Sequence, residues 1–285
     1  MVQFGNELTK RSDGRIQVTF FPDAQLGGNE IMINSVKVGA LDGVMSNLGV
    51  LSAAVPQIEV LELPFLFDDT PHAVRALNGA LGDSLKPDIE KGFNCRVVGW
   101  GTDGTRLMWN KVRPIRKPED LAGLKMRVQA SRTHQDTYAA LGALPTVVPF
   151  SELYAALQTG VVDGADVGVV DLLSLKFYQV TKYVSFTKHV SILDAMLISN
   201  SFLEKLSPDD LKIVIESGQA ASKIQVEHTL EVQAGAVEPL KKHGLEFFDV
   251  DDLTAFKSKM APVYDAMKER VPGGAELIAL ARTIK

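Results

Sequence analysis

The sequence is poor in cysteine, in clustered basic residues and in long apolar runs, and each shortage excludes a class of protein. A single cysteine, Cys95, among 285 residues rules out an internal disulfide and a cluster of thiolate metal ligands. Its apolar surroundings favour a buried, unreactive thiol. The 30 lysine and arginine residues are outnumbered by 35 acidic residues and form no basic block, so no nucleic-acid partner is expected. No stretch approaches about 20 apolar residues, which excludes a spanning helix.

Recognisable enzyme and cofactor motifs are also missing. The five histidines lack metal-ligand spacing, and neither an HExxH nor a GxSxG motif occurs. Residues 99–104 have the glycine spacing of a dinucleotide-binding loop, but a strand-like run follows them where that loop requires a helix. The sequence therefore predicts no metal and no cofactor.

Strand-like and helix-like segments alternate along the chain, which is typical of α/β proteins. With 285 residues and 46% hydrophobic residues, the chain is too long for one compact core, so two domains are expected. Residues 14–21 alternate polar and apolar side chains and predict a strand. Ser207 and Pro208, followed by two aspartates, predict the start of a helix that continues to about Ala236. At 1.5 Å per residue it would run about 45 Å, enough to span both domains.

Two arginines stand where an unpaired charge would be costly. Arg127 lies inside an apolar strand pattern, and Arg106 lies near the start of a strand after a glycine-rich segment. The planar guanidinium group binds a carboxylate through two parallel hydrogen bonds, which suits a carboxylate ligand. The alternative is that each arginine pairs with an acidic residue of the chain itself.

Six motifs follow one another along nearly the whole sequence. They are PDAQLGG at 22–28, LPFLF at 63–67, PIRKPEDL at 114–121, GLKMRV at 123–128, PFSELYAALQTGVVDG at 149–164 and TKH at 187–189. In this combination the sequence resembles the solute-binding proteins of TRAP transporters, the DctP-type family. The resemblance implies an α/β, two-lobed periplasmic-binding-protein fold of type II-like organisation, with the long helix spanning both lobes.

The same resemblance divides the chain into two interleaved lobes. Residues 1–103 with 192–231 would form lobe 1, and residues 104–191 with 232–285 would form lobe 2. The ligand cleft would lie between them, and the crossings near Asp103 and Ser191 would act as hinges. The protein would close around a small organic acid and deliver it to TRAP membrane permease subunits.

The resemblance assigns the main ligand contacts to the arginines. Arg127, in the GLKMRV motif, would bind the ligand carboxylate through two nitrogens, and Arg106 would add a second contact. Gln129 lies on the same strand face as Arg127. Ser46 and Asn47 end a lobe 1 strand that would face the cleft. Three aromatic residues are candidates for stacking on the ligand, with the hydrophobic core as the alternative: Phe65, Trp109 and Phe150.

Two features depart from the family pattern. Where the family usually continues with Gln-Glu-Asn-Pro, residues 165–168 read Ala-Asp-Val-Gly, and Val167 cannot form the hydrogen bond of the asparagine. Asp166 would instead accept a bond from a ligand hydroxyl or pair locally, and a hydroxy, sugar, 2-oxo or aromatic acid is expected as ligand. The chain also begins inside the first helix. The resemblance implies a periplasmic location, with the signal peptide and the first strand of the family absent from this chain.

Two other functions remain open at this point. A ligand sensor that docks on a signalling partner would have the same motifs. An enzyme acting on an organic acid would need a base near Arg127, for which only Glu152 and Asp166 are suitable. The sequence favours a receptor, not an enzyme, acting as a monomer.

Overall fold

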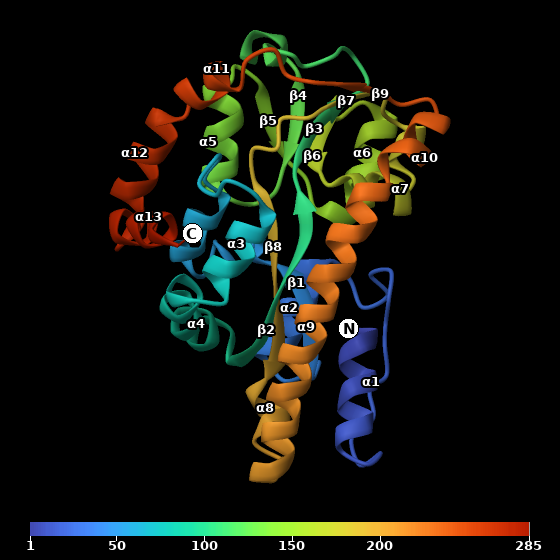
Figure 1. The fold of residues 1–285 in the computed structure, drawn as a ribbon, viewed down its shortest axis with the longest axis vertical. Helices are drawn as coiled ribbons and strands as arrows, with labels where there is room; N and C mark the ends of the chain where they lie inside the picture. Colours follow the sequence, from blue (N-terminus) through green and yellow to red (C-terminus); the bar gives the residue numbers. More distant parts are fainter. Residues whose placement is uncertain (285) are drawn as a thin grey trace.

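The chain folds around two separate β-sheets, which form the centres of two lobes in this computed structural model (Figure 1). Residues 1–284 are described. The smaller sheet is antiparallel, in the order β1 (Gly43–Asn47), β8 (Ser191–Ser199) and β2 (Cys95–Thr105). The larger sheet has the order β5 (Leu144–Val147), β4 (Lys125–Val128), β6 (Gly164–Val167), β3 (Leu107–Asn110), β7 (Tyr183–Ser185) and β9 (Glu246–Phe248). The predicted two-lobed α/β fold is confirmed.

The strands of the larger sheet run in mixed directions. β4 is parallel to both of its neighbours, β5 and β6, while β3 is antiparallel to β6 and β7. Because β4 lies inside the sheet, Met126, Arg127 and Val128 are all buried. An arginine in this position has its charged group in a desolvated setting, as its place in an apolar pattern predicted.

Helices surround both sheets (Figure 1). The α-helices are α1 (Val2–Arg11), α2 (Asn29–Lys37), α3 (Thr70–Leu77), α4 (Ala80–Phe93), α5 (Arg132–Ala140), α6 (Leu153–Thr159), α7 (Val169–Ser174), α8 (Asn200–Leu203), α9 (Pro208–Gly235), α10 (Val237–Lys242), α11 (Leu253–Ser258), α12 (Ala261–Arg270) and α13 (Gly274–Thr283). The 3₁₀ helices are η1 (Leu48–Leu51), η2 (Pro56–Glu62), η3 (Pro118–Leu121), η4 (Phe150–Glu152) and η5 (Phe177–Gln179). Among residues 1–284, no helix is both long and apolar enough to cross a membrane.

The long helix predicted from Ser207 is α9, with 28 residues. The side chain of Ser207 accepts a hydrogen bond from the backbone N–H of Asp210 and so caps the helix as expected. α9 packs along β2 and α1 in one lobe and reaches α7 and α10 in the other. Figure 1 shows it running beside β2 and β8 and ending near α7 and α10. It therefore braces both lobes.

The chain passes from one sheet to the other after β2 and returns before β8. β2 ends at Thr105 and β3 begins at Leu107, so only Arg106 separates a strand of one sheet from a strand of the other. The return crossing lies between β7 and β8, which begins at Ser191. Gly104 has φ +90°, a conformation that a side chain would strain, and it precedes the first crossing directly.

The C-terminal helices pack against other helices of the molecule. α12 packs on α5, whereas α13 packs on η2 and α4. Residues 232–285 were assigned to lobe 2 from the sequence, and β9 does lie in the larger sheet. The exact boundaries of the two lobes stay a prediction.

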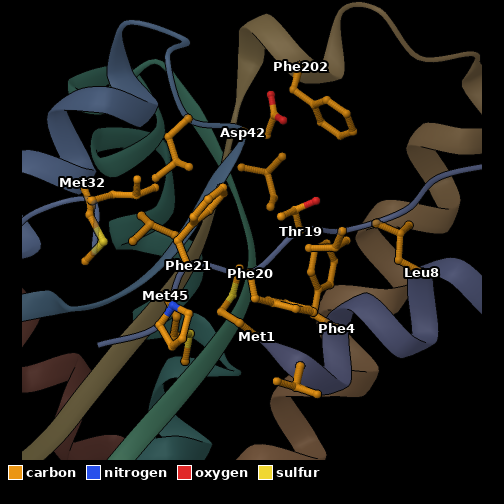
Figure 2. Close-up of a pocket in the computed structure, with 18 of the residues that line it drawn as sticks. Met1, Phe4, Leu8, Thr19, Phe20, Phe21, Met32, Asp42, Met45 and Phe202 are labelled. Carbon is orange, nitrogen blue, oxygen red and sulfur yellow. The ribbon is translucent and has the colours of Figure 1, made fainter. Parts of the chain in front are cut away.

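The strand predicted at residues 14–21 is wrong. Residues 14–16 form a turn and a bend, residues 17–21 have no regular secondary structure, and the segment pairs with no strand among the described residues. Ile16 and Val18 instead pack against a buried cluster built mainly from α1, α9 and β8, and Phe20 packs against Gly5 of α1. Figure 2 shows Phe20 and Phe21 beside a mostly apolar cavity of about 440 Å³ in this region, which Phe4 and Met45 also line. The alternating apolar side chains of this segment are therefore partly buried by packing mainly against helices, and the segment forms no β-ladder.

Candidate functional site

A second cavity, of about 220 Å³, lies where the two sheets approach each other. Its lining combines the ends of β1, β2 and β8 from the smaller sheet with β4, β6 and α7 from the larger lobe. Most of the lining is polar, with residues Asn29, Ser46, Asn47, Asp103, Arg106, Arg127, Gln129, Asp171, Asp194 and Gln225 joined by Met45, Val50, Phe150, Val167 and Ile192. A polar cavity that both lobes line is suited to a ligand that joins them.

Arg127 supplies a cation to this cavity that the protein leaves available. Its side chain is 3% exposed, and its Nε donates a hydrogen bond to the carbonyl oxygen of Val148 over 2.9 Å. The guanidinium group lies 5.6 Å from the ring centroid of Phe150. Within residues 1–284, neither of its terminal nitrogens has a hydrogen-bond or ion-pair partner. Burial, together with the charge of Arg106, lowers the pKa of Arg127 to about 10, so it stays protonated at neutral pH.

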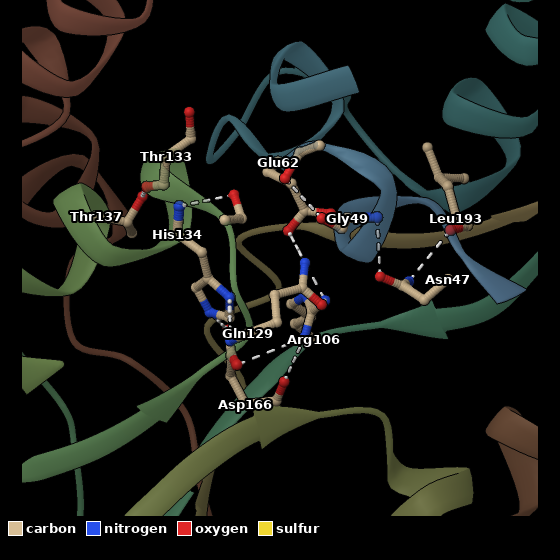
Figure 3. Close-up of polar contacts among 12 residues, drawn as sticks. Asn47, Gly49, Glu62, Arg106, Gln129, Thr133, His134, Thr137, Asp166 and Leu193 are labelled. Carbon is tan, nitrogen blue, oxygen red and sulfur yellow. Dashed lines mark hydrogen bonds and ion pairs between the residues drawn. The ribbon is translucent and has the colours of Figure 1, made fainter. Parts of the chain in front are cut away.

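Arg106 is already engaged inside the protein. Its Nη1 donates to the backbone oxygen of Asp166 over 2.8 Å, and its Nη2 donates to Oε1 of Gln129 over 3.2 Å. Ion pairs join it to Asp166 at 3.5 Å and to Glu62 at 3.8 Å. Gln129 in turn donates to Glu62 over 2.7 Å. Figure 3 shows this set of contacts reaching from η2, where Glu62 lies, to β6.

Asp166 anchors the other end of the set. Its Oδ2 lies 2.9 Å from Nε2 of His134 and 3.0 Å from Nε2 of His189. Burial alone would raise the pKa of Asp166, but the charges of His134 and Arg106 and the two histidine hydrogen bonds hold it well below the usual range. The carboxylate therefore stays ionised and holds Arg106 and both imidazoles in place.

The smaller lobe contributes two short polar side chains. Ser46 is 3% exposed, and its hydroxyl has no hydrogen-bond partner among the described residues. Asn47 donates to the backbone oxygen of Leu193 over 3.2 Å and accepts from the N–H of Gly49 over 3.0 Å, so its orientation is fixed (Figure 3). A buried hydroxyl without a partner carries a desolvation cost that a ligand could remove.

The model of the family described as bacterial extracellular solute-binding protein, family 7 (DctP) matches residues 1–270. The chain belongs to this family. The resemblance inferred from the six motifs is confirmed.

Several relatives of this solute-binding protein are named for the ligand that they bind or were solved with. It is 32% identical over 277 residues to the 2,3-diketo-L-gulonate-binding periplasmic protein YiaO of Escherichia coli (strain K12), covering 97% of this chain and 84% of that protein. A TRAP periplasmic solute-binding protein from Polaromonas sp. JS666, solved bound to D-erythronate, is 34% identical with a TM-score of 0.95, over 100% of this chain and 93% of that one. Another, from Roseobacter denitrificans with bound β-D-glucuronate, is 29% identical with a TM-score of 0.95, over 100% and 94%.

Six of the nine candidate residues in this family 7 protein line the cavity: Ser46, Asn47, Arg106, Arg127, Gln129 and Phe150. Three do not. Trp109 is fully buried against Phe177, because both faces of β3 are covered. Phe65 lies at the turn after η2, beside Lys257. Asp166 is turned into the histidine contacts, so it pairs locally, which was the alternative interpretation.

Several site residues were not predicted from the sequence. Glu62, in η2, was not a candidate, and neither were His134 and His189. Asp103, Asp171 and Asp194 line the cavity but were not candidates for binding. The sequence did carry one signal, because Asp194 is the one charged residue in the otherwise largely apolar run 191–199, which forms β8 and is buried throughout. A carboxylate in such a run raises the same question that singled out Arg127.

Proposed function

We propose that this protein is a periplasmic receptor that captures a sugar acid with one carboxylate and passes it to TRAP permease subunits. The observation that carries the proposal is the guanidinium group of Arg127, buried at the cavity with both terminal nitrogens unpartnered within residues 1–284. That arrangement matches the two oxygens of a carboxylate. The relatives solved with erythronate and glucuronate support a polyhydroxylated acid.

Closure of the lobes supplies the mechanism. Arg127 belongs to the larger lobe, whereas Ser46 and Asn47 belong to β1 of the smaller one. A ligand whose carboxylate binds Arg127 and whose hydroxyls reach β1 makes more contacts in the closed state than in the open state. It therefore shifts the population toward closure by that difference in affinity. Exclusion of water then strengthens the ion pair with Arg127.

Arg106 differs from Arg127 because it already forms ion pairs inside the protein. Its contacts with Glu62 and Asp166 offset its charge, and they connect η2 with β6. We infer that Arg106 and Gln129 hold the cavity wall in shape, while Arg127 makes the main ionic contact with the ligand.

A thermal-shift screen followed by calorimetry tests the proposal. The panel contains aldonates, uronates, simple dicarboxylates, 2-oxo acids and aromatic acids. A ligand at about 100 times its dissociation constant adds about 2.7 kcal/mol to the free energy of unfolding, so a binder raises Tm measurably. Sugar acids should give the largest shifts. If no aldonate or uronate binds while another acid does, the proposed ligand class is wrong.

Binding without turnover is part of the proposal. Mass spectrometry of a bound sugar acid after long incubation should return the acid unchanged, and a converted product would favour an enzyme. Size-exclusion chromatography with light scattering should give a monomer. Co-purification with TRAP permease subunits would separate transport from a sensing role.

A further inference from the structure

Three aspartates share the cavity with Arg127. Asp103 comes from β2, Asp171 from α7 and Asp194 from β8. Asp194 is 3% exposed, Asp171 is half-buried and Asp103 is the most exposed of the three. Asp194 lies directly opposite Asn47 in the ladder between β8 and β1, so it belongs to the same wall as the predicted lobe 1 contacts.

The three carboxyl groups are close enough to repel one another. Burial, and then the charge of Asp103, raises the pKa of Asp171 to about 7. Burial and the charges of Asp103 and Asp171 likewise raise the pKa of Asp194 well above its usual range. A fold that keeps three mutually repelling acids beside one cavity maintains an arrangement that costs stability.

The cavity is lined by two arginines and three aspartates. Arg106 is paired with Glu62 and Asp166, which leaves Arg127 as the cation available to an anion. The remaining charged side chains lining the cavity are the three aspartates. Arg127 and the Ser46 hydroxyl are both more than nine-tenths buried and unpartnered where they meet the cavity, within the part of the chain that is described. Both features point to a bound ligand.

We propose that Asp103, Asp171 and Asp194 form a subsite for ligand hydroxyl groups, which makes the cavity select acids with a single carboxylate over dicarboxylates of the same length. This proposal rests on the proposed function. Carboxyl groups accept hydrogen bonds from hydroxyls, and a protonated one can also donate. A second ligand carboxylate would meet like charge there and would have to take up a proton or displace one of the three groups.

Matched pairs of ligands test the selectivity by calorimetry at pH 7.5. Each pair has the same open carbon chain and differs in whether the far end is a second carboxylate: D-erythronate with meso-tartrate, D-galactonate with galactarate, and D-gluconate with D-glucarate. For each pair that binds, the single acid should bind at least ten-fold more tightly. Equal affinities within a pair would overturn the subsite while leaving the proposed function standing. If no member of any pair binds, the proposed function itself fails.

Two variants locate the selectivity. Asp171→Asn and Asp194→Asn each replace an ionisable carboxyl group with a neutral amide of almost the same shape, and each should bring the affinity ratio of the best pair closer to one. Asp83→Asn, at an exposed position on α4, is the matched control and should leave the ratio unchanged. Circular dichroism confirms that each variant is folded. If both folded variants keep the wild-type ratio, the aspartates are not the source of selectivity; should one fail to fold, the other decides.

Discussion

The guanidinium group of Arg127 lies over the ring of Phe150, 5.6 Å from its centroid, and both residues line the cavity. The Nε bond to Val148 fixes the third nitrogen. The side chain is therefore held in one orientation before any ligand arrives. Preorganisation of this kind reduces the entropic cost of binding.

Replacing Arg127 should remove most of the binding energy but not the fold. Arg127→Ala deletes the charge-assisted contact with the ligand carboxylate, and truncating a buried charged partner typically costs 2 kcal/mol or more, which is about a 30-fold loss of affinity. We expect calorimetry to show at least a ten-fold loss with an unchanged circular dichroism spectrum. Arg96→Ala, at an exposed position of β2, is the control and should bind as the wild type does. Unchanged affinity in Arg127→Ala would contradict the assignment of Arg127 as the anchor.

Arg106 should matter for stability more than Arg127 does. Arg106→Met keeps most of the side-chain volume but leaves Glu62 and Asp166 without the cation that faces both. Removing one partner from a buried ionic set costs about 3–5 kcal/mol. Urea unfolding should show a loss of this size. The exposed pair of Lys268 and Asp265 provides the comparison, since Lys268→Ala should change the free energy of unfolding by less than about 0.5 kcal/mol.

A substitution at Gly49 tests the hydrogen bond between Gln129 and Glu62. A Cβ at this residue would overlap Nε2 of Gln129 and crowd Oε1 of Glu62. Gly49→Ala should therefore separate Gln129 from Glu62 and cost about 1–3 kcal/mol of stability. Because Gln129 also lines the cavity, ligand affinity should fall as well.

The matched control for Gly49 is Gly235, at the end of α9, where a Cβ would meet nothing within 4 Å. Gly235→Ala should leave stability unchanged or raise it by up to about 1 kcal/mol, because alanine favours helix. If the two substitutions changed Tm equally, the side chains around Gly49 would have moved aside without a loss of stability, which would contradict the prediction.

Local patterns in the sequence predicted the long helix and the burial of Arg106 and Arg127, because both features depend on residues that are neighbours in the chain. The capping serine fixes the start of α9, and an arginine among apolar residues shows its burial directly. The ligand-facing role of Arg127, by contrast, came from the family resemblance. Pairing between distant segments was not accessible in this way. Glu62 meets Gln129 across 67 residues, and no local signal marks either as the other's partner.

The failed strand at residues 14–21 and the misplaced Trp109 have a related cause. Alternating apolar residues predict a surface with one buried face but do not specify whether a strand or a helix covers it. In residues 14–21 the cover is helical, and at Trp109 both faces of β3 are buried. Exposure to a cleft is a property of the assembled lobes, so an aromatic residue near a strand end cannot be assigned to ligand or core from its neighbours alone.

The raised pKa of Asp171, about 7 instead of 3.8, predicts how the stability of the ligand-free protein depends on pH. Between about pH 4 and pH 7 the folded protein holds a proton at this site that the unfolded chain has released. The free energy of unfolding that Asp171 contributes is therefore full below about pH 4 and is lost as the pH rises through 7. Asp171→Asn cannot titrate, so its Tm should fall less than that of the wild type between pH 5 and pH 8.

The comparison has to be made between the two proteins at each pH, because other groups titrate in the same range. Burial lowers the pKa of His189, which costs stability as the pH falls and so acts in the opposite sense. The charged groups acting on Asp171 are Asp103, Asp194, Arg106 and Arg127, and all four are present in both proteins. Differential scanning calorimetry at four pH values gives the difference in Tm directly. A difference that does not change with pH would show that Asp171 is ionised throughout, and the crowding of the three aspartates would then be weaker than their positions indicate.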